Sequence, residues 1–444
     1  MAMIQANRPI RRVVITGLGV VTPIGKSLDT FWRNLVEGQS GVGPLAQVPS
    51  ENYPFTFGGE AREFTGHISD FGEVPKDLQR QIKKSSKIMC REIAMGVASA
   101  QMALSHAGMR PGDLDPERVG VSFGTGYMVT MPGEFAGAIR QCLNDRGTFD
   151  FSRWGGEGMR QVTPLWLLKY LPNMPACHIA ILNDFRGPNN SLTLGEVAAN
   201  QSIGEAFHVV ARGSADMMVA GATDSRLSPL RTVQTALWEE LANDQSTPPE
   251  ACRPFDRDRT GMVVGEGSGT VILEELESAK RRGATIYGEI LGVGSSCVNG
   301  RDHVGQRETA LANAMRSAMR QHPETMENLG HIHAHGLSTK TSDIAEARAL
   351  HQVFRERTET LPVVAAKSHF GNLGAGSGAV ELIASLMATR QGHLFPVMNY
   401  KTSDPECLVK VNTDNQTPAG DTFLNLSVRG NGQASCLLVR KWDE

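Results

Sequence analysis

The sequence lacks any uninterrupted apolar run of about 18 residues, the length that a membrane-spanning helix needs. Residues 1–12 also lack the apolar stretch of a secretory signal peptide. No block of basic residues occurs, and 44 Lys and Arg stand against 47 Asp and Glu, for a net charge of −3. Nucleic-acid-binding surfaces concentrate Lys and Arg on one face, so none is expected here. We expect a cytoplasmic protein with no membrane span and no nucleic-acid partner.

Cysteine pairs at metal-binding or redox spacing are also missing. The seven cysteines are scattered along the chain, and none belongs to a C-x-x-C motif. A dispersed, odd-numbered set predicts reduced thiols and argues against a disulfide framework or a zinc site. Cys177 and Cys297 are candidate nucleophiles by residue type only, because no oxyanion-binding donors are expected around either.

What the sequence does have is an alternation of apolar strands and helices over 444 residues. Residues 12–21 form a continuous apolar segment, typical of a strand buried on both faces. The alternation predicts an α/β fold with a largely parallel sheet. Further strands are expected at 119–124, 215–221, 269–274, 286–294, 332–334, 363–365, 424–427 and 434–439, and helices at 27–38, 85–107, 308–320, 342–353 and 375–389.

The second half of the chain repeats the layout of the first. The segment at 286–294 resembles the opening strand, since both are apolar and end in glycines. Their separation of roughly half the chain predicts an internal duplication, with halves at residues 11–280 and 281–444. No linker rich in Pro, Gly or Ser divides the halves, so we expect them to share one core.

Glycine is abundant, with 47 residues gathered in short motifs such as those at 17–19 and 265–269. A dinucleotide-binding loop must follow a strand, open a helix and carry the full glycine pattern, and neither motif does so. These glycines therefore predict close backbone packing.

Three histidines, His331, His333 and His335, alternate along a predicted strand, so their side chains should share one face. A zinc site needs three or four converging ligands, and no Asp or Glu follows in a familiar ligand pattern. A surface histidine beside a buried one is the favoured interpretation, and no metal is expected.

A series of ordered blocks runs along the chain: Val14–Gly19, Leu171–Met174, Gly187–Asn189, Ile203–Ala206, Ala215–Gly221, Arg253–Gly261, Gly265–Gly267, His335-Gly336 and Lys367-Ser368. In these blocks the sequence resembles the β-ketoacyl-acyl-carrier-protein synthases, the condensing enzymes of fatty-acid and polyketide synthesis. The resemblance covers essentially the whole length. It implies a duplicated, five-layered, thiolase-like α/β sandwich, usually a dimer, which agrees with the duplication argued above.

The resemblance also implies where an active site would lie. In the family a nucleophilic Cys opens a buried helix, and the matching position here is Glu196. The first catalytic His of the family matches His335, whereas the second falls on Asn372. The family's lysine is kept as Lys367. The Cys-His-His set of the family thus reads Glu196-His335-Asn372 in this chain.

Other positions of the resemblance are partly kept. Asp343 and Glu346 match family residues in the segment after the first histidine. Thr339 matches a threonine that binds the pantetheine arm, but Leu337 replaces the other such threonine. The glycine-rich loop near the C-terminus is replaced by a segment that includes Arg429, which we take as a candidate substrate-binding residue. Binding of an acyl carrier protein is therefore still expected.

The substitutions change the chemistry that is possible. Glu196 would lie at a helix N-terminus that stabilises its charge, and it is a poor acyl acceptor because attack on a thioester gives an unstable mixed anhydride. Asn372 can donate a hydrogen bond but cannot exchange a proton, and losing one good donor costs roughly 3 to 4 kcal/mol in comparable sites. A Glu196–His335 contact would raise the pKa of the histidine. We expect Glu196 and His335 to form a stable ion pair in an active site that has lost its condensing activity.

Two classes of function remain from the sequence. One is a non-condensing partner, similar to the chain-length factors that pair with a catalytic ketosynthase and shape a shared acyl tunnel. The other is an enzyme, either a malonyl-carrier decarboxylase that uses His335 or an acyl-carrier reaction with Glu196 as general base. No cofactor is expected. The expected partners are an acyl carrier protein and a second subunit, in a homodimer or in a heterodimer with a ketosynthase.

Overall fold

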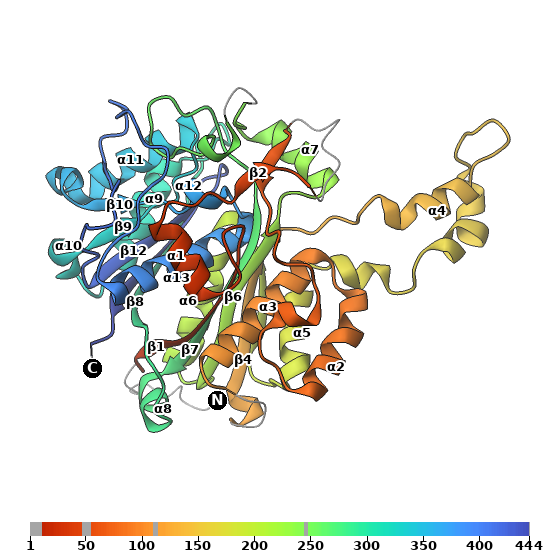
Figure 1. The fold of residues 1–444 in the computed structure, drawn as a ribbon, viewed down its shortest axis with the longest axis horizontal. Coiled ribbons are helices and arrows are strands. Elements are labelled where there is room, and N and C mark those ends of the chain that lie inside the picture. The colour runs from red at the N-terminus through yellow and green to blue at the C-terminus, as the bar shows by residue number, and fades with distance from the viewer. Residues whose placement is uncertain (1–10, 47–54, 110–113, 244–246, 444) are drawn as a thin grey trace.

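The computed structural model describes residues 11–46, 55–109, 114–243 and 247–443, and Figure 1 shows its ribbon. Its strands are β1 (Val13–Val21), β2 (Val42–Pro44), β3 (Phe57–Gly59), β4 (Val119–Thr125), β5 (Asn189–Thr193), β6 (Met217–Ser225), β7 (Glu266–Glu275), β8 (Gly288–Cys297), β9 (His331–His333), β10 (Pro362–Val364), β11 (Lys410–Val411), β12 (Thr422–Val428) and β13 (Gln433–Lys441). Apart from the β2–β3 pair, these form one 11-stranded sheet in the order β11-β10-β9-β12-β13-β8-β1-β7-β6-β4-β5.

Helices cover both faces of the strands. They are α1 (Leu28–Val36), α2 (Lys76–Ser85), α3 (Arg91–His106), α4 (Gly133–Gln141), α5 (Met174–Asn183), α6 (Ala198–Ala211), α7 (Pro229–Trp238), α8 (Leu276–Arg281), α9 (Arg307–Ala318), α10 (Thr325–Asn328), α11 (Lys340–Phe354), α12 (Lys367–Phe370) and α13 (Ser377–Gln391). No helix in the described ranges is long and apolar enough to cross a bilayer.

The strand order confirms the duplication. The strands β1-β7-β6-β4-β5 pair through two antiparallel and then two parallel steps, and β8-β13-β12-β9-β10 repeat that pattern. The two sets join only where Val14 and Ile15 pair with Glu289 and Gly288. The prediction of a largely parallel sheet is wrong, because antiparallel steps lie at the centre. Strands such as β6 are buried along their whole length, so their apolar runs carry no sign of strand direction.

The packing of the helices gives the five layers of the predicted sandwich. Helices α3 and α5 cover the outer face of the first strand set, and α9 with α11 covers the outer face of the second. Helices α6 and α13 contact each other and lie between the two strand sets. The observed fold is therefore the mixed α/β, thiolase-like sandwich with N- and C-terminal halves.

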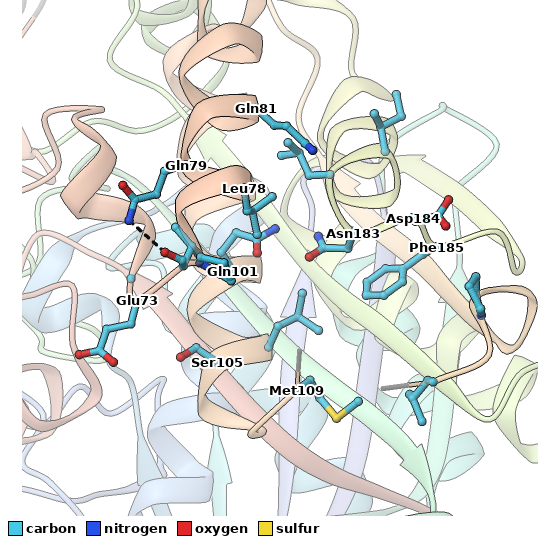
Figure 2. Close-up of a pocket in the computed structure, with 18 of the residues that line it drawn as sticks. Glu73, Leu78, Gln79, Gln81, Gln101, Ser105, Met109, Asn183, Asp184 and Phe185 are labelled. Carbon is cyan, nitrogen blue, oxygen red and sulfur yellow. Dashed lines mark hydrogen bonds between the residues drawn. The ribbon is translucent and has the colours of Figure 1, made fainter. Parts of the chain in front are cut away.

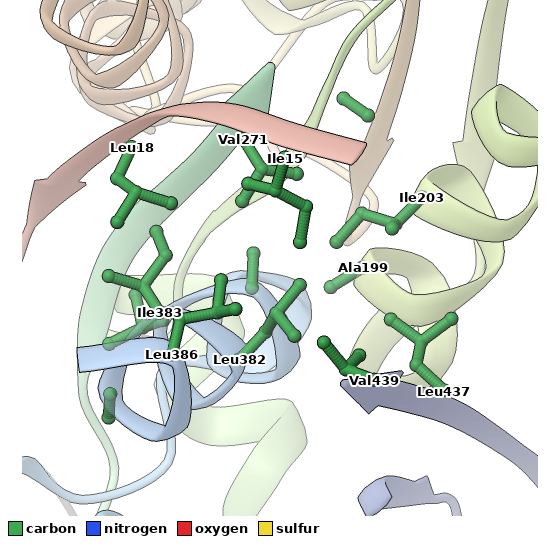
Figure 3. Close-up of a cluster of buried hydrophobic side chains, with 14 of the residues drawn as sticks. Ile15, Leu18, Ala199, Ile203, Val271, Leu382, Ile383, Leu386, Leu437 and Val439 are labelled. Atoms are coloured by element: carbon green, nitrogen blue, oxygen red, sulfur yellow. The ribbon is translucent and has the colours of Figure 1, made fainter. Parts of the chain in front are cut away.

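The two halves share one hydrophobic core, as the absence of a linker predicted. Figure 3 shows Ile15 and Val271 from the first strand set above Leu382 of α13, and Val439 on β13 of the second set in the same cluster. Ile203 of α6 closes the cluster from the side. Because α6 and α13 belong to this common core, the residues at their N-terminal ends are held by both halves.

The glycine motifs pack closely, as predicted. A Cβ atom at Gly19 would lie 2.1 Å from the carbonyl oxygen of Ser99, and one at Gly17 would lie 2.4 Å from that of Ala103. Side chains at these positions would push β1 away from α3, so glycine is needed for the close approach of strand and helix.

The predicted helix at 85–107 is wrong at its start. Helix α2 ends at Ser85, and α3 begins only at Arg91. Cys90 lies between them with extended backbone angles (φ −74°, ψ 174°) and caps α3. The apolar periodicity continues across this break because residues on both sides face the same core, so it could not reveal the interruption.

The segment between β4 and α5 leaves the body of the molecule as an arm, at the right of Figure 1. Sequence periodicity predicted no element for its residues 144–157. The arm contains α4 and an aromatic cluster, in which Phe135 lies 6.2 Å from Trp154 and 4.8 Å from Trp166 between ring centroids. Phe151 and Leu165 are 75% and 63% exposed on it. The arm therefore presents apolar side chains that its own residues do not cover.

Candidate functional site

The site lies at the N-terminal end of α6, between the two halves. A short 3₁₀ turn, Gly195–Val197, leads into α6, and the turn Gly374–Gly376 leads into α13 in the same way. Gly195 and Gly374 both have a φ of +59°, a conformation that favours glycine. A Cβ at Gly195 would also lie 2.9 Å from Nε of Arg429. The chain thus places Glu196 at the head of a buried helix, as the sequence predicted.

Glu196 is held between two arginines. Its Oε1 accepts a hydrogen bond from the Arg226 guanidinium, and its Oε2 lies 3.1 Å from Nε of Arg429. Asn372 Nδ2 donates to the same Oε1 at 3.4 Å. The carboxylate is buried, and Arg226 is nearly as buried beside it. The predicted Glu196–His335 ion pair is wrong, because the carboxylate is paired with arginines instead.

These contacts fix the charge state of the carboxylate. Burial alone would raise the pKa of Glu196, but the charges of Arg226 and Arg429 outweigh it and hold that pKa well below its ordinary value. Glu196 is therefore ionised across the physiological pH range. The carboxylate and its two arginines occupy the space in front of the α6 N-terminus.

His335 is buried close to Glu196 and is neutral. Burial and the charge of Lys367 lower its pKa well below the ordinary value, although Glu196 acts in the opposite direction. A rise in the pKa of this histidine was expected only from a contact with Glu196, which does not form; Glu196 acts in the predicted direction but is outweighed. Its Nδ1 lies 3.3 Å from Lys367 Nζ, and its Nε2 has no hydrogen-bond partner among the described residues. The imidazole thus keeps one ring nitrogen unused.

Lys367 links the histidine to α13. Its Nζ donates to the backbone oxygen of His335 at 2.7 Å and to Oε1 of Glu381. Both charged side chains are at most 1% exposed. Burial raises the pKa of Glu381 and the lysine charge lowers it, with burial prevailing. Lys367 fixes the position of the histidine segment through a buried ion pair.

Two carboxyl groups of α11 hold the loop that follows His335. Glu346 accepts the backbone N–H groups of His335 and Gly336 at 2.7 and 2.8 Å. Asp343 accepts those of Leu337 and Ser338 at 2.9 and 3.1 Å. Burial raises the pKa of Glu346 to about 7 and that of Asp343 to about 6. These residues position the loop by accepting its backbone donors.

Asn372 is fully engaged within the protein. Its Oδ1 accepts from Gly374 N at 3.1 Å and from Ser377 Oγ at 3.2 Å, which fixes the turn before α13. Its Nδ2 lies 2.9 Å from the Met262 sulfur in addition to its contact with Glu196. The Asn372 amide therefore stabilises the turn at the N-terminal end of α13.

The two predicted pantetheine-arm residues lie next to this loop. Thr339 caps α11, with its Oγ1 accepting from the backbone N–H of Ser342 at 3.2 Å. Leu337 packs in a small apolar cluster with Leu227 and Met262. Both residues therefore lie at the site, and both side chains are buried.

Arg226 and Arg231 were not among the predicted site residues. Arg226 directly follows β6, and Arg231 stacks on Tyr127 at 4.3 Å and lies 3.6 Å from Asp224. Each arginine keeps a buried Nε with no partner among the described residues. The available signal was the polar stretch Asp224-Ser225-Arg226, which ends the buried strand β6 and follows it, because the ends of such strands lie at the site-bearing edge of a sheet.

The remaining candidates lie elsewhere. Cys177 is on α5 and Cys297 is exposed at the end of β8. His331 and His333 share a face, as predicted, since both contact Ser385 Oγ, at 3.0 and 2.8 Å. The interpretation of one surface and one buried histidine is wrong, because all three histidines of this segment are buried. Within the described residues, no group of three or more His, Cys, Asp or Glu could hold a metal ion.

Comparisons with known proteins point to one family. Models of the beta-ketoacyl synthase N-terminal and C-terminal domains match residues 10–279 and 287–401. A 3-oxoacyl-[acyl-carrier-protein] synthase 2 from Synechocystis sp. is 34% identical over 406 residues, which cover 91% of both chains. Among solved structures, the ishigamide ketosynthase/chain length factor matches with a TM-score of 0.81 and 26% identity over 98% of this chain and all of the other. A type II PKS acyl-carrier protein in complex with its ketosynthase bound to the hexaketide matches with the same score, identity and coverage.

Proposed function

Because the chain belongs to the β-ketoacyl synthase family, we propose that it is a non-condensing subunit that works beside a catalytic ketosynthase, as a chain-length factor does. One observation carries this proposal: Glu196, at the head of α6, is locked between Arg226 and Arg429. We assign Glu196 to the position of the family's nucleophilic cysteine. An ionised carboxylate paired with two cations is not available to accept an acyl group.

The chemistry of condensation supports the same proposal. The tetrahedral intermediate of acyl transfer carries a negative oxygen, which needs hydrogen-bond donors in a site free of other anions. Here the ionised carboxylate of Glu196 lies at the N-terminus of α6 and accepts the hydrogen bonds that the two arginines could otherwise donate to such an oxygen. We assign Asn372 to the position of the second histidine, and its donors are directed at Glu196 and Met262. The site therefore lacks both the nucleophile and the donor pair.

The other candidate residues have supporting positions in this proposal. Lys367 holds His335 and its loop in place. Thr339 remains the candidate contact for the pantetheine arm, because a hydroxyl that accepts one hydrogen bond can still donate another. Arg429, 36% exposed along its side chain, pairs with Glu196 and lies at the outer side of the site. Substrate binding by Arg429 would require it to leave that pair.

A second subunit fits the exposed surfaces. Strand β5 ends the sheet, and its outward residues are exposed or half-buried. The apolar arm, together with Leu237 and Trp238 of α7, needs a cover that the described residues do not provide. We propose that a ketosynthase homologue covers these surfaces and that an acyl carrier protein delivers the acyl group.

The division of the chain into halves at residues 11–280 and 281–444 stays a prediction, and so does the cytoplasmic location.

One observation favours a second candidate function. The neutral His335 has an unpartnered Nε2, which could donate to the enolate formed when malonyl-carrier protein loses carbon dioxide. A malonyl-carrier decarboxylase would use this donor. Glu196 would repel the developing enolate, which makes decarboxylation the weaker candidate.

The two candidates predict different masses for malonyl-carrier protein incubated with the purified chain alone. We expect the intact mass to stay that of the malonyl form, with no acyl adduct on the chain itself. Conversion to the acetyl form that disappears in His335→Ala would contradict the proposal and establish the decarboxylase. Carrier protein incubated without the chain provides the control for spontaneous loss of carbon dioxide.

A further inference from the structure

A deep groove lies at the other end of the N-terminal half, away from Glu196. Helices α2, α3 and α5 form its walls, and Met217 at the start of β6 lies at its floor. Its volume is about 960 Å³, at the upper end of the range for small-molecule sites. Strand β6 runs from this floor to the Arg226 end, about 26 Å away at the usual rise per residue. The groove is therefore separate from the candidate site.

The inner part of the groove is apolar. Leu78 of α2, Leu104 of α3 and Leu182 of α5 are buried along it, and Phe185 adds an aromatic ring. Figure 2 shows Phe185 and Leu78 on opposite sides, with Met109 below them. A ligand in this space would bury an apolar face between the helices.

Two amide side chains face one another across this apolar space. Gln101 is 3% exposed, and its Nε2 meets no acceptor among the described residues. On the facing wall, Asn183 donates its Nδ2 to the Ile179 carbonyl at 2.8 Å, which directs its Oδ1 away from that bond as an acceptor. A buried donor without a partner costs free energy unless a ligand or water supplies an acceptor. The groove thus offers one donor and one acceptor.

Charge limits the kind of ligand. No Lys, Arg or His occurs among the described residues that line the groove, whereas Glu73 and Asp184 lie at its rim. Asp184 is paired with Arg186 at 2.9 Å, which leaves Glu73 to give the rim a negative charge. Among these described lining residues, an anionic ligand would find no counter-charge. The lining therefore favours an uncharged molecule.

We propose that this groove binds a small neutral carboxamide with a flat apolar group. The carboxamide oxygen accepts from Gln101 Nε2, its N–H donates to Asn183 Oδ1, and the apolar group packs against Leu78 and Phe185. The site does not depend on the function proposed above, because it shares no residue with the Glu196 site.

Benzamide is the probe, and benzoate of the same shape is its anionic counterpart. Methionine methyl groups labelled with ¹³C report binding, because Met109 and Met217 line the groove. Variants Met109→Leu and Met217→Leu assign their signals among the 18 methionines. We expect benzamide to shift both signals saturably and benzoate, at equal concentration, to shift neither. Unmoved signals with benzamide, or equal shifts with the two compounds, would overturn the proposal.

Two variants test the contacts themselves. Gln101→Leu keeps a side chain of similar volume and should weaken benzamide binding about tenfold, the usual effect of one lost hydrogen bond. Ser105→Trp, at an exposed rim position, should block binding without altering the interior. An unchanged Met262 signal, remote from the groove, shows that each variant is folded. Parent-like affinity in either folded variant would contradict the assigned binding mode.

Discussion

Replacing Glu196 with alanine is expected to lower the free energy of unfolding by about 3 kcal/mol, because removing one partner of a buried ion pair leaves an uncompensated charge. Arg226 is buried and would lose the carboxylate that it contacts, while Arg429 would lose its partner at 3.1 Å. The measurement is the urea-induced unfolding of the parent and the variant at pH 7, compared by midpoint and slope.

Helix α6, which follows Glu196, provides the matched control. Glu205 of α6 forms an exposed pair with Arg212 at 3.7 Å, and such pairs contribute at most about 1 kcal/mol. Glu205→Ala should therefore leave the unfolding midpoint almost unchanged. Replacing both Glu196 and Arg226 with apolar residues should recover part of the loss. Equal midpoints for the Glu196 and Glu205 variants would show that Glu196 is not held as described.

Replacing Lys367 with methionine should have a large and pH-dependent effect. The variant leaves Glu381 buried without its ammonium partner, so the pKa of Glu381, already raised by burial, rises further. A folded-state pKa above the unfolded value means that the penalty is full at high pH and disappears as pH falls through the folded pKa. We expect a loss of about 3 kcal/mol at pH 8 and a much smaller loss at pH 5.

Two further variants isolate the origin of that pH dependence. Lys367→Met combined with Glu381→Gln removes the titrating carboxyl group, so its unfolding free energy relative to the parent should change little between pH 5 and 8. Lys401→Met breaks an exposed pair with Glu250 at 3.3 Å and should be nearly neutral at both pH values. A loss in Lys367→Met that is equal at pH 5 and pH 8 would contradict a buried Lys367–Glu381 pair.

Much of the fold could be predicted because apolar patterning follows the core. The predicted strands at 119–124 and 434–439 fall within β4 and β13, and the helix at 342–353 lies within α11. Strand direction could not be predicted, since the central strands are apolar on both faces. The break before α3 was also hidden, because a 3₁₀ turn at Ser86–Ile88 and the extended residues Met89 and Cys90 leave the apolar periodicity intact.

The candidate site was predicted in its residues but not in its contacts. Glu196, His335, Asn372 and Lys367 were found by resemblance and lie together in the structure. The pairing was predicted wrongly because Arg226 comes from a different part of the chain, 30 residues after Glu196, and no local pattern joins the two. Glu196 still raises the pKa of His335, but burial and the charge of Lys367 lower it by more, so the imidazole stays neutral.

The most direct test of the proposed function uses a purified complex of this chain with a catalytic ketosynthase. The rate of condensation of acyl- and malonyl-carrier protein is measured with parent chain and with His335→Ala in this chain only. We expect the two rates to agree within about twofold, because no reacting atom contacts His335 in a non-condensing subunit. A hundredfold loss, which corresponds to about 2.7 kcal/mol of transition-state stabilisation, would show that this chain carries out chemistry itself.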